Sequence, residues 1–157
     1  LGDDMKQKWK QFLLFLAIPT VLGFLIGLLT SAGSVYQTLD KPPLSPPGIV
    51  FPIVWTILYI LMGISSYLIF NTCHKERKKA LIVYFFQLFL NLLWPILFFT
   101  CQNYFLSLLE LLFLIYVVIK MIILFFTINK TAGYLQIPYL LWLLFASYLN
   151  MGIVFLN

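Results

Sequence analysis

Five apolar runs, each long enough to cross a lipid bilayer, limit what this chain can fold into. The runs cover about residues 12–32, 49–72, 80–100, 105–128 and 134–156. At a rise of about 1.5 Å per residue, each run makes a helix of roughly 30 Å or more, which matches the thickness of the hydrocarbon core. Only 10% of the residues are charged, far fewer than the roughly one quarter found in soluble domains. We therefore predict an all-α integral membrane protein whose 157 residues form a single membrane domain, a five-transmembrane-helix bundle.

The first run, residues 12–32, has a second interpretation as a cleavable signal peptide, because three lysines precede it and small residues end it. The apolar part of a signal peptide has about 7–15 residues, and this run is longer, so we favour a membrane helix. Gly23 and Gly27 form a GxxxG motif within the run. Such a motif lets two helices approach closely, and we favour a neighbouring helix of the same chain over a dimer seam.

Basic residues outside the five runs lie almost entirely on one side of the predicted bundle. Five spans place the termini on opposite sides, so eight basic residues fall on the N-terminal side and one, Lys41, on the other. The eight are Lys6, Lys8, Lys10, Lys75, Arg77, Lys78, Lys79 and Lys130. The positive-inside rule then places the N-terminus in the cytoplasm and the first loop outside, and we expect a bacterial cell membrane. Because the net charge of +5 sorts by loop, it indicates topology rather than nucleic-acid binding.

The first outer loop, residues 33–48, is rich in proline in its second half. Four prolines in six residues, from Pro42 to Pro47, fix φ and remove backbone donors, so this part is stiff and non-helical. The loop leads into the second apolar run, where Pro52 falls in the first turn of a helix. We call residues 33–48 the lid, because they would cover the outer end of the bundle.

Polar and aromatic side chains within the runs share one face of each run and a similar depth. The spacing is three or four residues on each run, which places the side chains on one helical stripe. Trp55, Trp94 and Asn150 all lie about 9 Å from the outer surface, and Asn91 lies about 14 Å from it. An unpaired amide in hydrocarbon costs several kcal/mol, so the amides should face inward. The candidate ligand-binding residues are Tyr36, Trp55, Tyr59, Gln87, Asn91, Trp94, Trp142, Ala146, Leu149 and Asn150.

These amides also have a purely structural interpretation. Asn and Gln often join membrane helices by hydrogen bonds, and for any single residue this explanation is at least as good. For the whole set we favour a pocket, because tryptophans and amides at matched depth beneath a stiff loop are typical of a binding site with a few polar groups.

Other polar residues offer little conventional chemistry. Glu110 enters the outer half of the fourth run about 8 Å deep, and Lys120 lies within snorkelling reach of the inner interface. Cys73 and Cys101 end consecutive runs, so they lie a membrane apart and cannot form a disulfide. Cys73 and His74 alone provide too few ligands for a metal site, so no metal is expected.

Three segments resemble the translocator protein family, also called tryptophan-rich sensory proteins or peripheral benzodiazepine receptors. They read KPPLSPPGIVFPIVWTILYILMGISSYL, QLFLNLLWPILFF and IPYLLWLLFASYLN, and the resemblance covers about Tyr36 to Asn150. It implies a five-helix bundle, often a homodimer, that binds protoporphyrin IX or a haem-like tetrapyrrole as ligand and requires no cofactor. In animals the family also binds cholesterol and synthetic drugs.

The resemblance assigns roles to individual residues. Trp55 and Trp142 resemble two ligand-contacting tryptophans implicated in bacterial porphyrin breakdown, and Asn91 with Trp94 resembles the polar-aromatic pair of the third helix. Ala146, Leu149 and Asn150 are similar to the segment near bound ligand, and Tyr36 to the first-loop aromatic.

The chain also departs from the family pattern. Leu44 stands where the lid usually has tryptophan, which alters one wall of the lid, and Leu106 stands where animal members have tryptophan. Met151 stands where the sterol-recognition pattern wants tyrosine, so we predict no cholesterol binding through that motif.

Three functions follow as hypotheses. The leading one is a membrane receptor or binding protein that holds a small hydrophobic tetrapyrrole in the outer half of the bundle and senses or transports it. The alternative is a light-dependent porphyrin-degrading enzyme that uses Trp55 and Trp142, since no Ser-His-Asp, Cys-His or metal cluster is visible. A dedicated carrier is third, because the inverted repeats typical of carriers are not visible.

Overall fold

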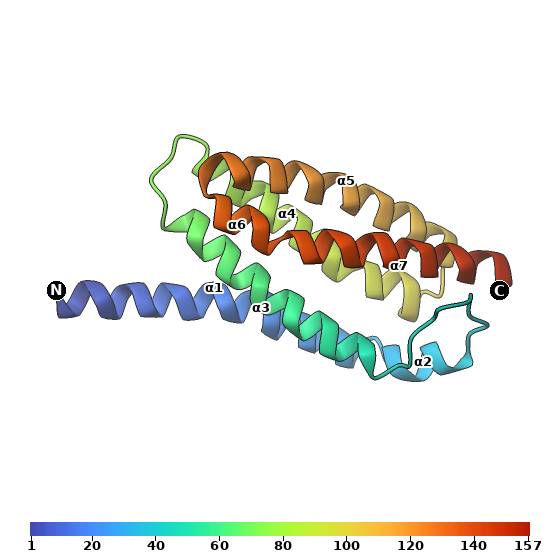
Figure 1. Ribbon diagram of the computed structural model, residues 1–157. Helices are drawn as coiled ribbons and strands as arrows, with labels where there is room; N and C mark the ends of the chain where they lie inside the picture. The colour runs from blue at the N-terminus through green and yellow to red at the C-terminus, as the bar shows by residue number, and fades with distance from the viewer.

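The computed structural model describes all 157 residues as a helical bundle without strands (Figure 1). The elements are α1 (Gly2–Leu29), α2 (Ala32–Thr38), α3 (Val50–Phe70), α4 (Arg77–Pro95), the π-helix η1 (Ile96–Thr100), α5 (Tyr104–Ile128), α6 (Lys130–Leu135) and α7 (Ile137–Leu156). Five segments are long and apolar enough to span a membrane: Gly2–Leu29, Val50–Phe70, Arg77–Thr100, Tyr104–Ile128 and Lys130–Leu156. The predicted all-α bundle of five membrane helices is therefore confirmed.

The helices form two groups that meet along the bundle. α4, α5 and α7 pack together, while α1 packs mainly along α3. In Figure 1 the N-terminus and the α3–α4 turn lie at one end, and the lid and the C-terminus lie at the other. α3 packs against α6 near the first end and runs obliquely to α7 toward the lid.

Proline and asparagine mark most of the helix boundaries that differ from the predicted ones. Pro95 has no N–H, and the turn that follows it widens into η1. The last run is broken at Gln136, because Pro138 occupies the start of α7 and α6 ends before it. Asn103 is the N-cap of α5, because its side chain accepts a hydrogen bond from the backbone N–H of Leu106 at 3.0 Å.

The N-terminal part of the chain also has more helix than expected. α1 begins at Gly2 rather than near residue 12, because the polar residues ahead of the apolar run include good helix formers. α2 occupies the first half of the lid, residues 33–48, and only the proline-rich half is non-helical.

α5 supplies the largest share of the core. Its buried residues include Leu111, Leu114, Val118, Met121 and Phe125, each at most 2% exposed. Their spacing of three and four residues places them on one helical face, which packs against α4 and α7.

Two glycines let α1 lie close to α3. A Cβ on Gly63 would lie 2.6 Å from the Cα of Leu16, so only glycine fits where the two backbones meet. Gly23 lies directly against the ring of Tyr59, whereas Gly27 has open space around its Cα. The GxxxG motif of α1 therefore packs within the chain through Gly23 alone.

The remaining predicted loop and interface residues have ordinary surroundings. Cys73 and Cys101 are both free and exposed, as expected for thiols at opposite ends of the bundle. His74 accepts a hydrogen bond at Nδ1 from the backbone N–H of Glu76, at 3.0 Å. Lys120 is exposed, with its Nζ 5.6 Å from the centre of the Tyr116 ring.

Candidate functional site

The lid is folded around Tyr36 of α2. The Tyr36 hydroxyl donates a 2.6 Å hydrogen bond to the carbonyl of Pro46, which closes the proline-rich half back onto α2. Lys41 lies 4.8 Å above the Tyr36 ring, and the edge of Phe51 packs 4.8 Å from it. Burial raises the pKa of Tyr36, so the hydroxyl remains a hydrogen-bond donor at neutral pH.

The lid is also tied to the end of α7. Tyr148 donates a 2.7 Å hydrogen bond to the carbonyl of Pro43, and the side chain of Asn157 bonds both backbone groups of Asp40, at 2.8 and 3.2 Å. Gly152 lies in direct contact with the ring of Pro42. The proline-rich half of the lid therefore packs against the C-terminal end of α7.

Aromatic rings from α3 and α7 interdigitate beneath the lid. Phe51 meets Trp142 edge to face at 5.9 Å, and one turn deeper Trp55 meets Tyr139 at 6.3 Å. Trp55 also stacks on Tyr59 at 5.5 Å. Because the two helices are antiparallel, these pairs form a continuous aromatic column from the lid toward the middle of the bundle.

The column ends on a buried polar network that joins α3, α4 and α7. The Tyr59 hydroxyl donates to Oδ1 of Asn91 at 2.6 Å, and Nδ2 of Asn91 donates to the Tyr139 hydroxyl at 2.9 Å. The Tyr139 hydroxyl donates in turn to Oε1 of Gln87 at 2.8 Å. We call these four residues, Tyr59, Gln87, Asn91 and Tyr139, the central network. All four are almost fully buried, and each hydroxyl or amide oxygen has a partner.

A second set of hydrogen bonds surrounds Asn150 nearer the lid end of the bundle. Its Oδ1 accepts from Nε1 of Trp94 at 3.0 Å and from the Ser107 hydroxyl at 3.2 Å. Its Nδ2 donates to the backbone carbonyl of Tyr104 at 3.0 Å. Asn150 thus joins α4, α5 and α7, and its polar atoms already have protein partners.

A groove opens between α3 and α7 beside the aromatic column. Its volume is about 400 Å³, and it is lined by Val54, Ile57, Leu58, Pro138, Leu141, Trp142 and Phe145. This lies within the range of roughly 300–1,000 Å³ that is typical of small-molecule sites. Six of the seven lining residues are hydrophobic, as expected for a site that holds an apolar guest.

Trp142 is the tryptophan of this groove, and its indole N–H is buried without a hydrogen-bond partner. A buried donor left unpaired costs about 1–3 kcal/mol. Such a group is a candidate for an acceptor supplied by a ligand. Glu110 on α5 also carries buried polar atoms without hydrogen-bond partners, since both of its carboxylate oxygens are enclosed by the protein and neither accepts a hydrogen bond.

The ten predicted site residues do not all lie in one pocket. Tyr59, Gln87 and Asn91 belong to the central network, and Trp94 and Asn150 hydrogen-bond to each other. Trp55 lies in the aromatic column, Trp142 borders the groove, and Tyr36 supports the lid. Leu149 is buried, and Ala146 is half-buried against the main core.

Sequence reasoning missed Tyr139, Phe51, Ser107 and Tyr148. The argument used for the amides applies equally to Tyr139, because a phenol within an apolar run also needs a hydrogen-bond partner. Ser107 and Tyr148 carry weaker signals, since a serine can bond its own helix and a tyrosine near a helix end is typical of the interface.

Comparison with known proteins identifies the family of this chain. The model of the TspO/MBR family matches residues 15–156. The chain is 38% identical over 124 residues to the tryptophan-rich protein TspO of Chlorobaculum tepidum, and this alignment covers 78% of each of the two chains.

Two further relatives match over nearly the whole chain. The tryptophan-rich sensory protein of Cereibacter sphaeroides is 33% identical over 98% of this chain and 95% of its own. The translocator protein of Bos taurus is 32% identical over 93% of this chain and 89% of its own. With its five membrane helices and these matches, the chain belongs to the TspO/MBR family of multi-pass membrane proteins.

Proposed function

We propose that this protein binds a porphyrin of the protoporphyrin type in the groove between α3 and α7, and that occupancy of this groove is the signal it senses or the cargo it moves. The observation that carries the proposal is that Trp142 lines this apolar groove while its buried indole N–H has no hydrogen-bond partner. A flat aromatic guest matches the aromatic walls, and a carboxylate or carbonyl on the guest would accept the hydrogen bond.

A membrane binding or sensing role agrees with the family, whose members include a tryptophan-rich sensory protein and a translocator protein. The choice of a porphyrin rests on the groove and on the family resemblance together. Phe145 and Trp142 offer ring faces along one side of the groove, at 5.5 Å from each other. Stacking on such faces would supply much of the affinity.

One cation of the lid can also meet an anionic guest, although the neighbouring Asp40 leaves the lid without net charge. Lys41 is the one basic residue of the outer loops, and it lies above the Tyr36 ring with its Nζ donating to the carbonyl of Leu39 at 3.1 Å. The ammonium has three donors, so two remain for the carboxylates of a porphyrin that enters beneath the lid.

Titration of the purified protein with protoporphyrin IX tests this proposal, with quenching of tryptophan fluorescence as the readout. Saturable quenching is expected, and the double variant Trp55→Phe with Trp142→Phe should bind far more weakly. Trp9→Phe is the matched control, because Trp9 lies on the exposed N-terminal part of α1, away from the lid. Binding that is not saturable, or equal binding by the double variant and the control, would contradict the proposal.

A second candidate function is the light-dependent oxidation of the bound porphyrin by dioxygen. It is favoured by the contact of Trp55 with two tyrosines, Tyr59 at 5.5 Å and Tyr139 at 6.3 Å, since adjacent indole and phenol rings can pass an electron. Under illumination in air, loss of porphyrin absorbance that requires both Trp55 and Trp142 would favour this enzyme. Loss at the same rate in the double variant would exclude it.

A further inference from the structure

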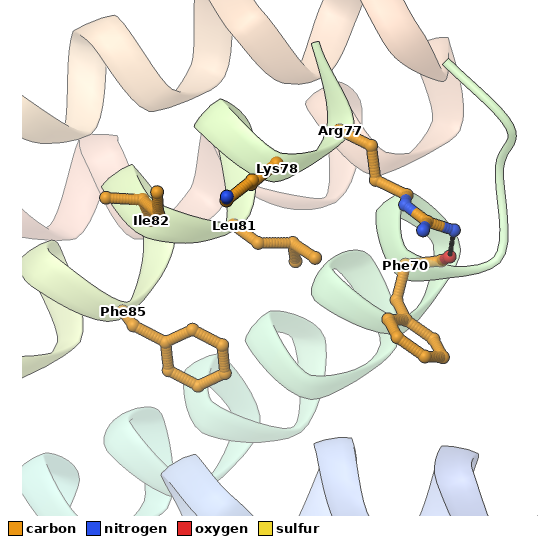
Figure 2. Close-up of a pocket in the computed structure, with 6 residues that line it drawn as sticks. All are labelled: Phe70, Arg77, Lys78, Leu81, Ile82 and Phe85. Atoms are coloured by element: carbon orange, nitrogen blue, oxygen red, sulfur yellow. Dashed lines mark hydrogen bonds between the residues drawn. The ribbon is translucent and has the colours of Figure 1, made fainter. Parts of the chain in front are cut away.

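A second groove lies at the opposite end of the bundle from the lid, where α3 turns into α4 (Figure 2). Its volume is about 480 Å³, and six residues line it: Phe70, Arg77, Lys78, Leu81, Ile82 and Phe85. Two of the six are cations and four are apolar. The proposed porphyrin site uses none of them.

The two cations of this groove have no acidic partner in the protein. One guanidinium nitrogen of Arg77 donates to the carbonyl oxygen of Phe70 at 3.0 Å, as Figure 2 shows, and the guanidinium carbon lies 5.6 Å from the Phe70 ring. Neither Arg77 nor Lys78 lies within 4.0 Å of a carboxylate. An arginine has five N–H donors and a lysine has three, so most of their donors remain available to an anion.

The apolar residues extend from these cations into the membrane. Ile82 and Phe85 lie four and seven residues after Lys78 on α4, which is about 6 and 10 Å deeper along the helix. Ile82 is 60% exposed and Phe85 is 40% exposed, although both face a groove. Phe15 of α1 packs against Phe70 at 5.0 Å and near Phe85 at 6.4 Å, and so closes the far side.

The net positive charge at this end of the bundle favours binding of an anion. It carries eight of the ten basic residues, against three acidic residues, Asp3, Asp4 and Glu76. With the N-terminus in the cytoplasm, as the distribution of basic residues predicts, the groove faces the leaflet in which anionic lipids concentrate. A soluble anion would contact the cations alone and leave the apolar part of the groove empty.

We propose that this groove is a binding site for an anionic phospholipid, whose phosphate lies against Lys78 and Arg77 and whose acyl chain follows Ile82 and Phe85. The ligand matches both halves of the groove, since charge and hydrocarbon occur in the order in which a phospholipid presents them to a membrane protein.

The experiment compares two lipids on the purified full chain in detergent micelles. Dioleoyl phosphatidylglycerol and dioleoyl phosphatidylcholine are titrated separately, and bound lipid is counted by native mass spectrometry while the thermal midpoint is followed. Phosphatidylglycerol should bind saturably and at least tenfold more tightly than phosphatidylcholine. Lys78→Gln should weaken phosphatidylglycerol binding about fivefold, as expected for the loss of one cation at a membrane surface.

Lys79→Gln is the matched control, because Lys79 is exposed on the same helix and does not line the groove. It should change the affinity for phosphatidylglycerol by less than twofold. An equal loss in Lys79→Gln, or equal binding of the two lipids, would overturn the proposal in favour of general surface attraction.

A third measurement distinguishes a lipid-binding site from a site for soluble phosphate. Glycerol 3-phosphate at the same phosphate concentration should leave the thermal midpoint unchanged, and Ile82→Gln should weaken phosphatidylglycerol binding several-fold while the two cations remain. Stabilisation by glycerol 3-phosphate equal to that by the lipid, or full lipid binding by Ile82→Gln, would show a phosphate site and overturn the lipid site.

Discussion

The two tryptophans Trp94 and Trp142 show how differently the same side chain is used in two regions of the bundle. The Trp94 indole donates to Asn150 and so helps to join α4 to α7. The Trp142 indole borders the α3–α7 groove and has no acceptor. Hydrogen-bonded polar groups stabilise the bundle, whereas an unpaired one lowers its stability and is a candidate for binding.

The same contrast separates the central network from the groove. In the central network, the hydroxyls and amide oxygens of Tyr59, Gln87, Asn91 and Tyr139 are paired with one another. A ligand would have to break these bonds to reach the amides. We therefore infer that Asn91, a predicted ligand-binding residue, acts mainly in stability, and that Trp142 is the polar contact for a guest.

Asn91→Leu tests whether the central network stabilises the bundle, and it should have the largest effect. The change removes two hydrogen bonds and leaves the hydroxyls of Tyr59 and Tyr139 short of partners, so we expect a loss of about 2–4 kcal/mol in stability. Thermal unfolding in detergent measures it. Thr56→Val is the control, because Thr56 is exposed and bonds only within α3, and it should change stability by about 0.5 kcal/mol or less. An Asn91→Leu variant as stable as the Thr56→Val variant would show that the network does not hold the helices.

A matched pair of indole substitutions tests the contrast directly. Trp142→Phe should leave stability nearly unchanged, because removal of the unpaired donor offsets the packing lost with the smaller ring, and it should weaken protoporphyrin binding about tenfold through the missing donor. Trp94→Phe should lower stability by about 0.5–1.5 kcal/mol and leave protoporphyrin affinity within about twofold. Thermal unfolding and fluorescence titration on both variants give the four values. If the two variants exchanged these properties, the assignment of the groove would be wrong.

Most of the fold followed from the sequence, whereas the pairing of polar side chains did not. Hydropathy identified five spans because unpaired backbone groups in lipid leave few alternatives to helices. The cost of polar groups in lipid identified Asn91 and Asn150 as inward-facing, and both are buried. Successive residues of a helix point about 100° apart, so a small rotation of a helix decides whether an indole meets an amide or a groove. That rotation depends on packing, for example on the close approach of Gly63 to Leu16.

The lid provides a further test, through Gly152. A Cβ at this position would overlap the Pro42 ring, so Gly152→Ala should push the proline-rich half of the lid away from α7. We expect dissociation of bound protoporphyrin to become about fivefold faster, because the proposed guest enters and leaves beneath the lid. Stopped-flow displacement measures this rate. Gly27→Ala is the control, since a Cβ there meets no atom within 4 Å. Equal dissociation rates in the two variants would show that the lid does not control ligand release.

Tyr148→Phe removes a single bond of the lid and should have the smallest effect. The hydroxyl donates to the carbonyl of Pro43 at 2.7 Å from an exposed position, where water can replace it. The loss is therefore at the lower end of a hydrogen bond's net contribution, about 0.5 kcal/mol, which corresponds to about a twofold faster dissociation of protoporphyrin. In combination with Gly152→Ala the effect should vanish, because a displaced lid no longer reaches Tyr148. If the two changes instead multiplied, Tyr148 would act on the ligand by a route other than the lid.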